Sequence, residues 1–407
     1  MTWPLVKLSN GIAEVVRGVT FSQQDSIRES REGYLPVLRA GNIAEELNTK
    51  SDLVWVPEAY VSAKQMLRRN DIVMCTSSGS PAIVGKAAIA ENDFYGSWGA
   101  FNAVIRATNK IAPSFLYFWT QSSQFRSWRD RAAKGANIQN IRHSDLSGLE
   151  VPLPPPSEQH RIVELLARAN ALRRLRRAAD AKAARILPAL FLKMFGDPAS
   201  NPMGWTVKPF DDAFRDTTAG NGKLQSKQFQ KSGAVAVIDQ GQSKIAGYTD
   251  DESLLYKGDL PVVIFGDHTR IFKFVDHPFV LGADGVRVLT SKEGFTPLFA
   301  YWHCQMLDIP SAGYSRHFKF LKEKPFICPD AALQKRYTVI AEGLMAQLSA
   351  LDNAAREIEH LFSAMLHKAF SGNLTAKWRQ VHMQELLAEM QQQAEALNLP
   401  MPKDLAA

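Results

Sequence analysis

Polar and basic residues gather in several stretches that could bind nucleic acid. These stretches are rich in Gly, Ser and Asn, and their side chains offer amide, hydroxyl and cationic groups. Asn and Gln pair with adenine, Arg and Lys pair with guanine or bind phosphate, and Ser and Thr do either. The alternative is that these stretches are solvated loops. The candidate DNA-binding residues are Ser77, Ser78, Ser80, Lys86, Lys134, Asn137, Gln139, Asn140, Arg142, Lys223, Gln225, Lys227, His268, Arg270, Arg316, His317 and Lys319.

Motifs of enzymes that act on nucleotides or nucleic acid are missing from the sequence. No Gly-x-x-x-x-Gly-Lys-Ser/Thr stretch occurs, and Gly79 and Gly85 lack the spacing of a dinucleotide-binding or methyl-donor-binding turn. Asn201-Pro202-Met203-Gly204 superficially resembles the Asn-Pro-Pro-aromatic motif of amino-methyltransferases. It lacks the second proline and the aromatic residue, so we interpret it as an interdomain turn.

Three cysteines, Cys75, Cys304 and Cys328, occur without the spacing of a zinc site or a disulfide framework. His303 next to Cys304 could suggest a nucleophile pair, but the aromatic residues around it favour burial. We therefore predict no metal, no cofactor and no catalytic residue in this chain.

Composition places the chain among soluble globular proteins. It has 407 residues, of which 45% are hydrophobic and 22% charged, which is enough for two or three domains. No secretory signal and no run of about 18 apolar residues occurs, so we expect a cytoplasmic protein. The net charge of +7 weakly favours polyanionic partners.

One pattern occurs twice, such that residue n in the first copy matches residue n+175 in the second. Each copy has a proline at its start, a Gln-x-Arg pair, a long helical stretch and a Lys-x-Phe exit. The matched pairs are Pro154 with Pro329, Gln159 with Gln334, Arg161 with Arg336, Lys193 with Lys368 and Phe195 with Phe370. Two matched helices, each after a larger block that does not repeat this pattern, indicate a duplicated spacer.

Apolar residues recur in both copies with the spacing of a coiled-coil seam. Chain order makes the paired helices antiparallel with one block at each end, and about 36 residues would span roughly 55 Å, or about 16 base pairs. Ser157 and Asp330 are expected N-caps, and Pro188 predicts a kink or an earlier helix end. The predicted seam is Ile162, Leu165, Ala169, Leu172, Arg176, Ala179, Ala183, Ile186 and Leu190, with Tyr337, Ile340, Leu344, Gln347, Leu351, Ala354, Ile358, Leu361 and Met365.

The two copies differ in charge. Residues 158–195 carry nine Lys or Arg against three acids, whereas residues 333–370 carry four against four. Arg173, Arg174, Arg176 and Arg177 form either a solvated stripe or a surface for a partner or phosphate. The sequence does not decide between these two interpretations.

The two blocks, 1–151 and 204–326, are predicted to be mixed α/β. Short β-rich runs are separated by Gly, Pro, Asn and Asp. The expected strands are 35–38, 71–76, 103–107, 235–238, 260–265 and 285–289. Residues 115–119 resemble residues 298–302, each just after a proline, which suggests that the blocks are related.

The whole arrangement resembles the specificity subunit of type I restriction-modification systems. The resemblance lies in the Pro-Pro, Glu-Gln and Arg-Ile start at 154–162, in the exit from the second helix at 365–374, and in the Trp-containing starts at Trp3 and Trp205. The second helix start departs from the pattern because Leu333 replaces the glutamate.

That resemblance implies an α+β fold with a pseudo-twofold internal repeat. Two recognition domains, 1–151 and 197–326, alternate with two conserved helices, 152–196 and 327–372, that form an antiparallel coiled coil, and a helical tail follows at 373–407. The family's motif implies that Glu158, Gln159, Arg161, Gln334 and Arg336 bind partner subunits.

The resemblance also implies a non-catalytic subunit that reads a split double-stranded DNA site. Two modification subunits would methylate adenine with S-adenosylmethionine, and restriction subunits, in systems that have them, would use ATP and Mg²⁺. Two alternatives remain open from the residues alone, namely a coiled-coil scaffold without DNA readout and a stand-alone DNA-modifying enzyme.

Overall fold

A computed structural model describes residues 3–135, 138–283, 285–313 and 315–400. The chain forms two compact units, residues 1–175 with 355–407 (unit 1) and residues 176–354 (unit 2). Each unit contains one globular block and parts of the long helices. The unit boundaries therefore run through the helices rather than at the predicted block borders, because each block packs on the helical turns nearest to it.

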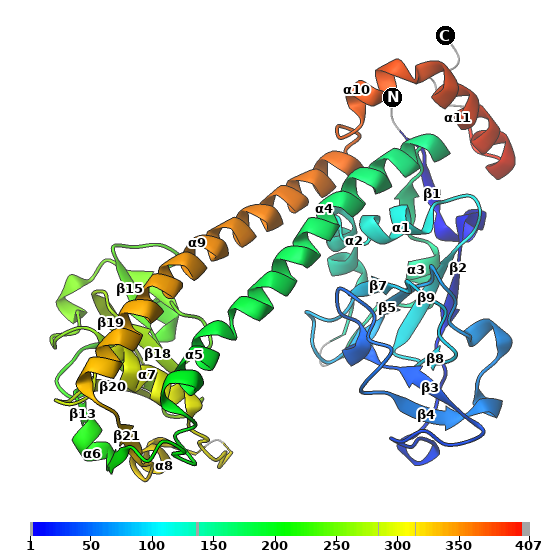
Figure 1. The fold of residues 1–407 in the computed structure, drawn as a ribbon. Helices are drawn as coiled ribbons and strands as arrows, with labels where there is room; N and C mark the ends of the chain where they lie inside the picture. The colour runs from blue at the N-terminus through cyan, green and yellow to red at the C-terminus, as the bar shows by residue number, and fades with distance from the viewer. Residues whose placement is uncertain (1–2, 136–137, 284, 314, 401–407) are drawn as a thin grey trace. The chain divides into compact units, whose positions relative to one another are not determined.

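Two sheets form the centre of unit 1 (Figure 1). Strands β2 (Ala13–Arg17), β9 (Asn102–Ala107), β5 (Ile72–Cys75) and β7 (Ala87–Ile89) make an antiparallel sheet in that order. In the second sheet, β3 (Tyr34–Leu38) pairs antiparallel with β4 (Val54–Pro57) and parallel with β8 (Ser97–Trp98). The smaller elements are β1 (Leu5–Lys7) paired with β11 (Glu150–Pro152), β6 (Ser77–Ser78) paired with β10 (Gln139–Asn140), α1 (Pro113–Trp119), α2 (Ser123–Ala132) and α3 (His143–Ser147).

Unit 2 repeats this arrangement of strands. Its antiparallel sheet has the order β13 (Phe214–Asp216), β20 (Val286–Ser291), β17 (Val262–Gly266) and β18 (Phe272–Val275). In the second sheet, β15 (Val235–Ile238) pairs antiparallel with β16 (Gly247–Thr249) and parallel with β19 (Phe279–Gly282), beside β14 (Lys223–Leu224). The remaining elements are β12 (Thr206–Lys208) paired with β21 (Phe326–Cys328), α6 (Phe210–Ala213), α7 (Pro297–Met306) and α8 (Phe318–Lys322).

The strand order is the same in both antiparallel sheets. Among the four strands of each sheet, the first in sequence lies at one edge, the last in sequence lies next to it, and the two intermediate strands follow. All six predicted strands are confirmed within one or two residues. The two stretches that resemble each other, 115–119 and 298–302, also fall on matching helices, α1 and α7, each with a proline in its first turn.

The long helices are α4 (Pro156–Ala183) and α9 (Ala331–Phe370), and a shorter helix, α5 (Ile186–Phe195), follows α4. The break between α4 and α5 confirms the effect predicted for Pro188, which lies in the first turn of α5 where a proline needs no hydrogen bond. The predicted N-cap Ser157 is wrong, because α4 already begins at Pro156. Asp330 directly precedes α9, and its carbonyl accepts a hydrogen bond from the Gln334 amide.

The start of α4 packs against the end of α9 inside unit 1. Ile162 and Leu166 share a core with Phe362 and Leu366. Arg173, further along α4, contacts Glu359, earlier in α9, so the two segments run antiparallel there. This packing corrects part of the predicted seam, since Leu172 and Leu361 are each 61% exposed.

The cause of this difference is the globular block. Phe115 and Phe118 of α1 lie against Phe370 and Phe362, with ring centroids 5.4 and 6.4 Å apart. The helices therefore bury a face that meets α1 as well as each other. The heptad pattern assumes that the two helices contact only one another.

The tail forms two helices, α10 (Ala376–Val381) and α11 (Met383–Leu397), which belong to unit 1. Leu386 and Met390 of α11 are buried. The Glu389 carboxylate accepts hydrogen bonds from the backbone amide of Ser157, at 2.9 Å, and from the Ser157 hydroxyl. The tail thus supplies an acceptor and a negative charge to the first turn of α4, where both are favourable.

Candidate nucleic-acid interface

Two of the predicted DNA-binding stretches of unit 1 lie side by side in the structure. Gln139 pairs with Ser78, and Asn140 with Ser77, in the β6–β10 ladder. The Ile141 amide donates to the Thr76 carbonyl at 2.8 Å, which fixes this ladder at the end of β5. Residues that are far apart in the sequence therefore form one surface.

This ladder presents cationic and amide groups to solvent. The backbone amide and carbonyl of Lys134 form hydrogen bonds with the carbonyl and amide of Asn140. Lys134, Asn140 and Arg142 are all exposed. A cavity of about 230 Å³ opens beside them, and Arg17 and His143 also line it. We call this surface, with Arg17, Ser77, Ser78, Lys134, Gln139, Asn140, Arg142 and His143, the unit 1 rim. The sequence analysis missed Arg17, because Arg17 lies on β2, far from the other residues in sequence.

Two predicted stretches of unit 2 meet at the corresponding place. The His317 amide donates to the Asp267 carbonyl at 2.8 Å, and the Phe318 amide donates to the Asp267 carboxylate at 2.7 Å. These bonds join the turn after β17 to the segment before α8, just as the unit 1 rim joins the turn after β5 to the segment before α3. Arg316 is exposed in the segment before α8, and Lys319 is exposed in the first turn of α8.

Some candidate residues of unit 2 have internal roles instead. His317 is only 1% exposed, and its ring nitrogens contact the Asp267 carbonyl and the Ala312 amide. Because His317 is buried, it supports the turn rather than contacting DNA directly as we expected. The Arg270 guanidinium donates to the Ile309 carbonyl at 2.8 Å, and the His268 amide donates to Gln240 at 3.0 Å.

The remaining candidates lie apart from these two surfaces. Lys223, Gln225 and Lys227 are exposed on β14 and the turn after it, in the other sheet of unit 2. Ser80 is exposed in the loop that follows β6, and its amide donates to the Ser78 hydroxyl. Asn137 lies outside the described residues.

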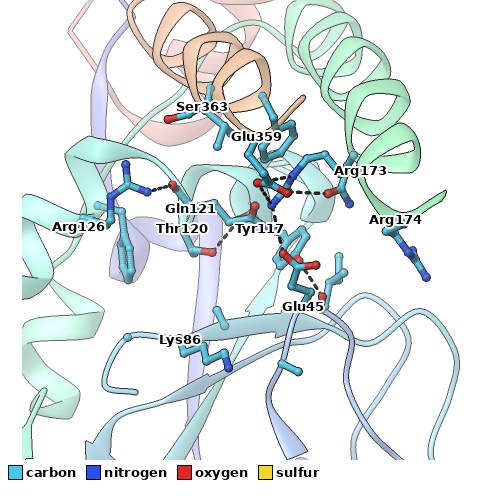
Figure 2. A pocket seen from close by; sticks show the side chains of 18 of the residues that line it. Glu45, Lys86, Tyr117, Thr120, Gln121, Arg126, Arg173, Arg174, Glu359 and Ser363 are labelled. Atoms are coloured by element: carbon cyan, nitrogen blue, oxygen red, sulfur yellow. Dashed lines mark hydrogen bonds and ion pairs between the residues drawn. The ribbon is translucent and has the colours of Figure 1, made fainter. Parts of the chain in front are cut away.

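Lys86 lines a second and larger cavity in unit 1, of about 440 Å³. Figure 2 shows Lys86 on the sheet side of this cavity and Glu359 on the helix side. The Arg173 side chain donates to Glu359 at 2.9 Å and to Glu45 at 3.2 Å, and its guanidinium lies 4.0 Å from the centroid of the Phe362 ring. Lys86 therefore faces the long helices rather than the unit 1 rim.

Two arginines of α4, Arg173 and Arg174, make contacts with acidic residues of unit 1. Arg173 is 9% exposed, and Arg174 forms ion pairs with Glu46 and, at 2.7 Å, with Glu91. Neither is a freely solvated charge. Both attach α4 to the globular block of unit 1.

The repeated glutamines make matching hydrogen bonds in the two units. Gln159 accepts from the Ala112 amide at 2.8 Å and donates to the Pro154 carbonyl at 2.8 Å. Gln334 accepts from the Thr296 amide at 2.9 Å and donates to the Pro329 carbonyl at 2.8 Å. Ala112 and Thr296 are the N-cap residues of α1 and α7. Each glutamine therefore joins a long helix to the start of a helix in its own block.

Glu158 has no such counterpart, because Leu333 occupies the matching position. Its carboxylate is 0% exposed and accepts hydrogen bonds from Trp3, Thr375 and Arg379, at 2.9, 2.6 and 2.6 Å. Three of the residues expected to bind partner subunits instead make hydrogen bonds inside their own units, namely Glu158, Gln159 and Gln334. Their side chains therefore support the fold rather than contact a partner directly. Arg336 is exposed and Arg161 partly exposed, so both remain available to a partner.

Known proteins resemble this chain over most of its length. The family described as type I restriction modification DNA specificity domain matches residues 2–177. The chain is 27% identical to the EcoKI type I restriction enzyme specificity subunit of Escherichia coli K12, and 25% identical to the StySPI specificity subunit of Salmonella potsdam; both alignments cover 93% of this chain and 90% of the relative. Residues 2–177 therefore match a type I DNA specificity domain, and the chain is similar to type I specificity subunits over most of its length.

A solved structure of this family shares the fold. The S subunit of a type I restriction-modification system from M. genitalium aligns with a TM-score of 0.54 at 15% identity, over 91% of this chain and 96% of that one. The resemblance drawn from the helix starts and exits is therefore confirmed, as is a fold of mixed strands and helices with long helices.

The structure assigns packing and turn roles to the residues first considered for catalysis. Asn201 exchanges hydrogen bonds with the backbone of Trp205, at 2.8 and 2.9 Å, so it closes a turn. Burial lowers the pKa of His303 to about 3 and raises the pKa of the Cys304 thiol. Across the part of the chain that the structure describes, no group of three His, Cys, Asp or Glu side chains could hold a metal ion, and no helix is long and apolar enough to cross a membrane.

Proposed function

We propose that this chain is a specificity subunit that binds double-stranded DNA and reads a two-part site, one part with each unit. The observation that carries the proposal is the match between the units. The antiparallel sheets of the two units have the same strand order. Unit 1 joins the turn after β5 to the segment before α3, and unit 2 joins the turn after β17 to the segment before α8. Exposed basic residues lie at both junctions. Two related surfaces with different side chains suit the reading of two different half-sites.

The long helices would set the distance between the two half-sites and would receive the other subunits. Arg161 and Arg336, at matching positions near the helix starts, are the candidates for partner contact. We propose two modification subunits as partners, and restriction subunits in systems that have them. S-adenosylmethionine, ATP and Mg²⁺ would bind to those subunits, and this chain would act as the non-catalytic part of a cytoplasmic complex.

Sequencing of methylated adenines tests this proposal. Cells that produce the chain with its modification subunit should carry methylation at one two-part motif with a fixed gap. Methylation without sequence preference would favour the scaffold alternative, and methylation by the purified chain alone would favour the enzyme alternative.

A matched insertion tests the role of the helices. One heptad added to both α4 and α9 lengthens the helices by about 10 Å, which corresponds to about three base pairs. The preferred gap should change while both half-sites stay the same. An unchanged gap would contradict the spacer role.

A further inference from the structure

Phe101 is an exposed aromatic residue beside the unit 1 rim. Its side chain is 69% exposed, although it lies between the buried strand residue Asn102 and the half-buried Ala100. Within the described part of the chain, no other aromatic ring and no cation contacts its ring. A single exposed apolar side chain is common on proteins, so its exposure alone does not indicate a function.

The position of Phe101 is nevertheless tightly fixed. Its carbonyl accepts three hydrogen bonds, from the Thr76 amide at 2.9 Å, the Thr76 hydroxyl at 3.1 Å and the Ser77 amide at 3.0 Å. The same Ser77 pairs with Asn140 in the β6–β10 ladder. The backbone that carries the Phe101 ring is therefore held directly against the polar ladder.

The surroundings of Phe101 are positively charged. Ala100 and Asn102, its two neighbours in sequence, line the 230 Å³ cavity together with Arg17 and Arg142. Among the described residues, no carboxylate forms an ion pair with Arg17, Lys134 or Arg142. An apolar ring next to a cavity that is lined by arginines without carboxylate partners suits DNA, whose phosphates would pair with the cations while its bases offer apolar faces and methyl groups.

Unit 2 has no side chain at the matching position. The Asp267 amide donates to the Gly285 carbonyl at 2.7 Å, as the Thr76 amide donates to the Phe101 carbonyl. Gly285 has a φ of +80°, and a Cβ placed on it would lie 2.6 Å from the Gln240 amide oxygen. The shared backbone therefore needs no aromatic residue here, so Phe101 is not explained by the fold.

From these observations we infer that Phe101 makes an apolar contact to a base in the half-site read by unit 1. The inference rests on the proposed function and adds a specificity-determining residue to it. The contact is either with a thymine methyl group or with the face of an unstacked base, both of which apolar side chains use in DNA complexes. Gln240 and the turn after β17 would offer hydrogen bonds at the same place in unit 2.

The test measures binding of the complex between the chain and its modification subunit to DNA duplexes. The duplexes carry the two-part motif that sequencing of methylated adenines identifies. Phe101→Ala should weaken binding to this site about tenfold, as expected for the loss of one aromatic contact to a base. Phe101→Leu should retain part of the affinity. Tyr95→Ala is the control, since Tyr95 is 75% exposed in the same unit but precedes β8 in the other sheet, and its loss should change nothing.

Two DNA substitutions distinguish the forms of the contact. If the ring touches a thymine methyl, uracil at one position should weaken binding by the native complex and not by the Phe101→Ala complex. If it stacks on a base, 2-aminopurine fluorescence at one position should change on binding of the native complex only.

The inference fails if Phe101→Ala binds the site as the native complex does. It also fails if the variant no longer binds the modification subunit in the absence of DNA. A third contrary outcome is that the variant weakens binding to all duplexes equally, while the effect of uracil and the 2-aminopurine fluorescence are the same as with the native complex. By contrast, a native complex that prefers no site would contradict the proposed function itself.

Discussion

At the end of β5, the Thr76 amide donates to the carbonyl of Phe101, and at the end of β17 the Asp267 amide donates to the carbonyl of Gly285. The backbone geometry is shared between the units, but one presents an aromatic ring and the other a glycine. Hydrogen bonds between main-chain groups therefore fix the place of the surface, while side chains at that place are free to differ. Such a division suits the proposed reading of a different half-site by each unit.

The starts of the long helices show the same division. The buried glutamine is shared, but the residue before it is Glu158 in one helix and Leu333 in the other. Unit 1 uses the charge to attach its tail, whereas unit 2 has Leu333 packed against an apolar core.

Arg379→Ala should have the largest effect. It removes the cationic partner of a fully buried carboxylate, which typically costs about 3–5 kcal/mol of folding free energy. Urea unfolding, followed by hydrogen exchange in unit 1, would measure the loss. The double variant Glu158→Leu with Arg379→Leu imitates the apolar position of unit 2 and should recover most of the stability. A single variant as stable as the native chain would show that the ion pair is unimportant.

Gln159→Ala and Gln334→Ala should each destabilise only their own unit. Each leaves buried backbone groups without a partner, at a cost of about 1–3 kcal/mol. Hydrogen exchange should accelerate at the Ala112 amide in the first variant and at the Thr296 amide in the second. Acceleration at both amides in either variant would contradict the assignment of each glutamine to one unit.

Unit 2 should lose stability in mild acid more than unit 1. Burial lowers the pKa of His303 from 6.5 to about 3, and α1, the matching helix in unit 1, has no histidine. Below pH 6.5 the unfolded chain binds a proton that the folded unit does not, so stability falls as the pH falls. The loss should reach roughly 2 kcal/mol at pH 5.

Thermal unfolding of the native chain and of His303→Gln, at pH 7 and pH 5, checks this expectation. The variant keeps an acceptor for the Ile327 amide but cannot titrate in this range. An equal pH dependence in both proteins would mean that other groups cause it.

Arg142→Ala should have the smallest effect. If Arg142 contacts a phosphate, the slope of log K against log salt should fall in magnitude by about 0.9, with little change in sequence preference. Arg316→Ala is the matched variant in unit 2, because Arg316 is exposed in the segment before α8, which corresponds to the segment before α3. An unchanged slope in Arg142→Ala would remove that residue from the interface.

Much of the fold could be predicted because local signals and tertiary packing agree. β-rich runs bounded by turn residues became the strands of both sheets, and Pro188 separated α4 from α5. The helical seam was partly wrong because α1 covers the helices, and no sequence period reports which third element packs on a helix. The exposure of Leu172 is the result of that contact.

The candidate site was predicted in pieces but not as a surface. Polar stretches at Ser77 and Gln139 were recognised, yet only the β6–β10 pairing places them together. Glu158 and Gln159 were expected to bind partner subunits because the family's motif implies that role, and the sequence does not show that both are buried. Phe101 gave no signal, since an aromatic residue at the start of a strand is normally part of the core.

The contacts of the tail also order events during synthesis. Glu158 obtains its cationic partner from a residue 221 positions later, and the Ser157 amide obtains its acceptor from one 232 positions later. The first turn of α4 therefore leaves the ribosome long before its partners exist. The unit that begins the chain completes its folding only after all of unit 2 has been made.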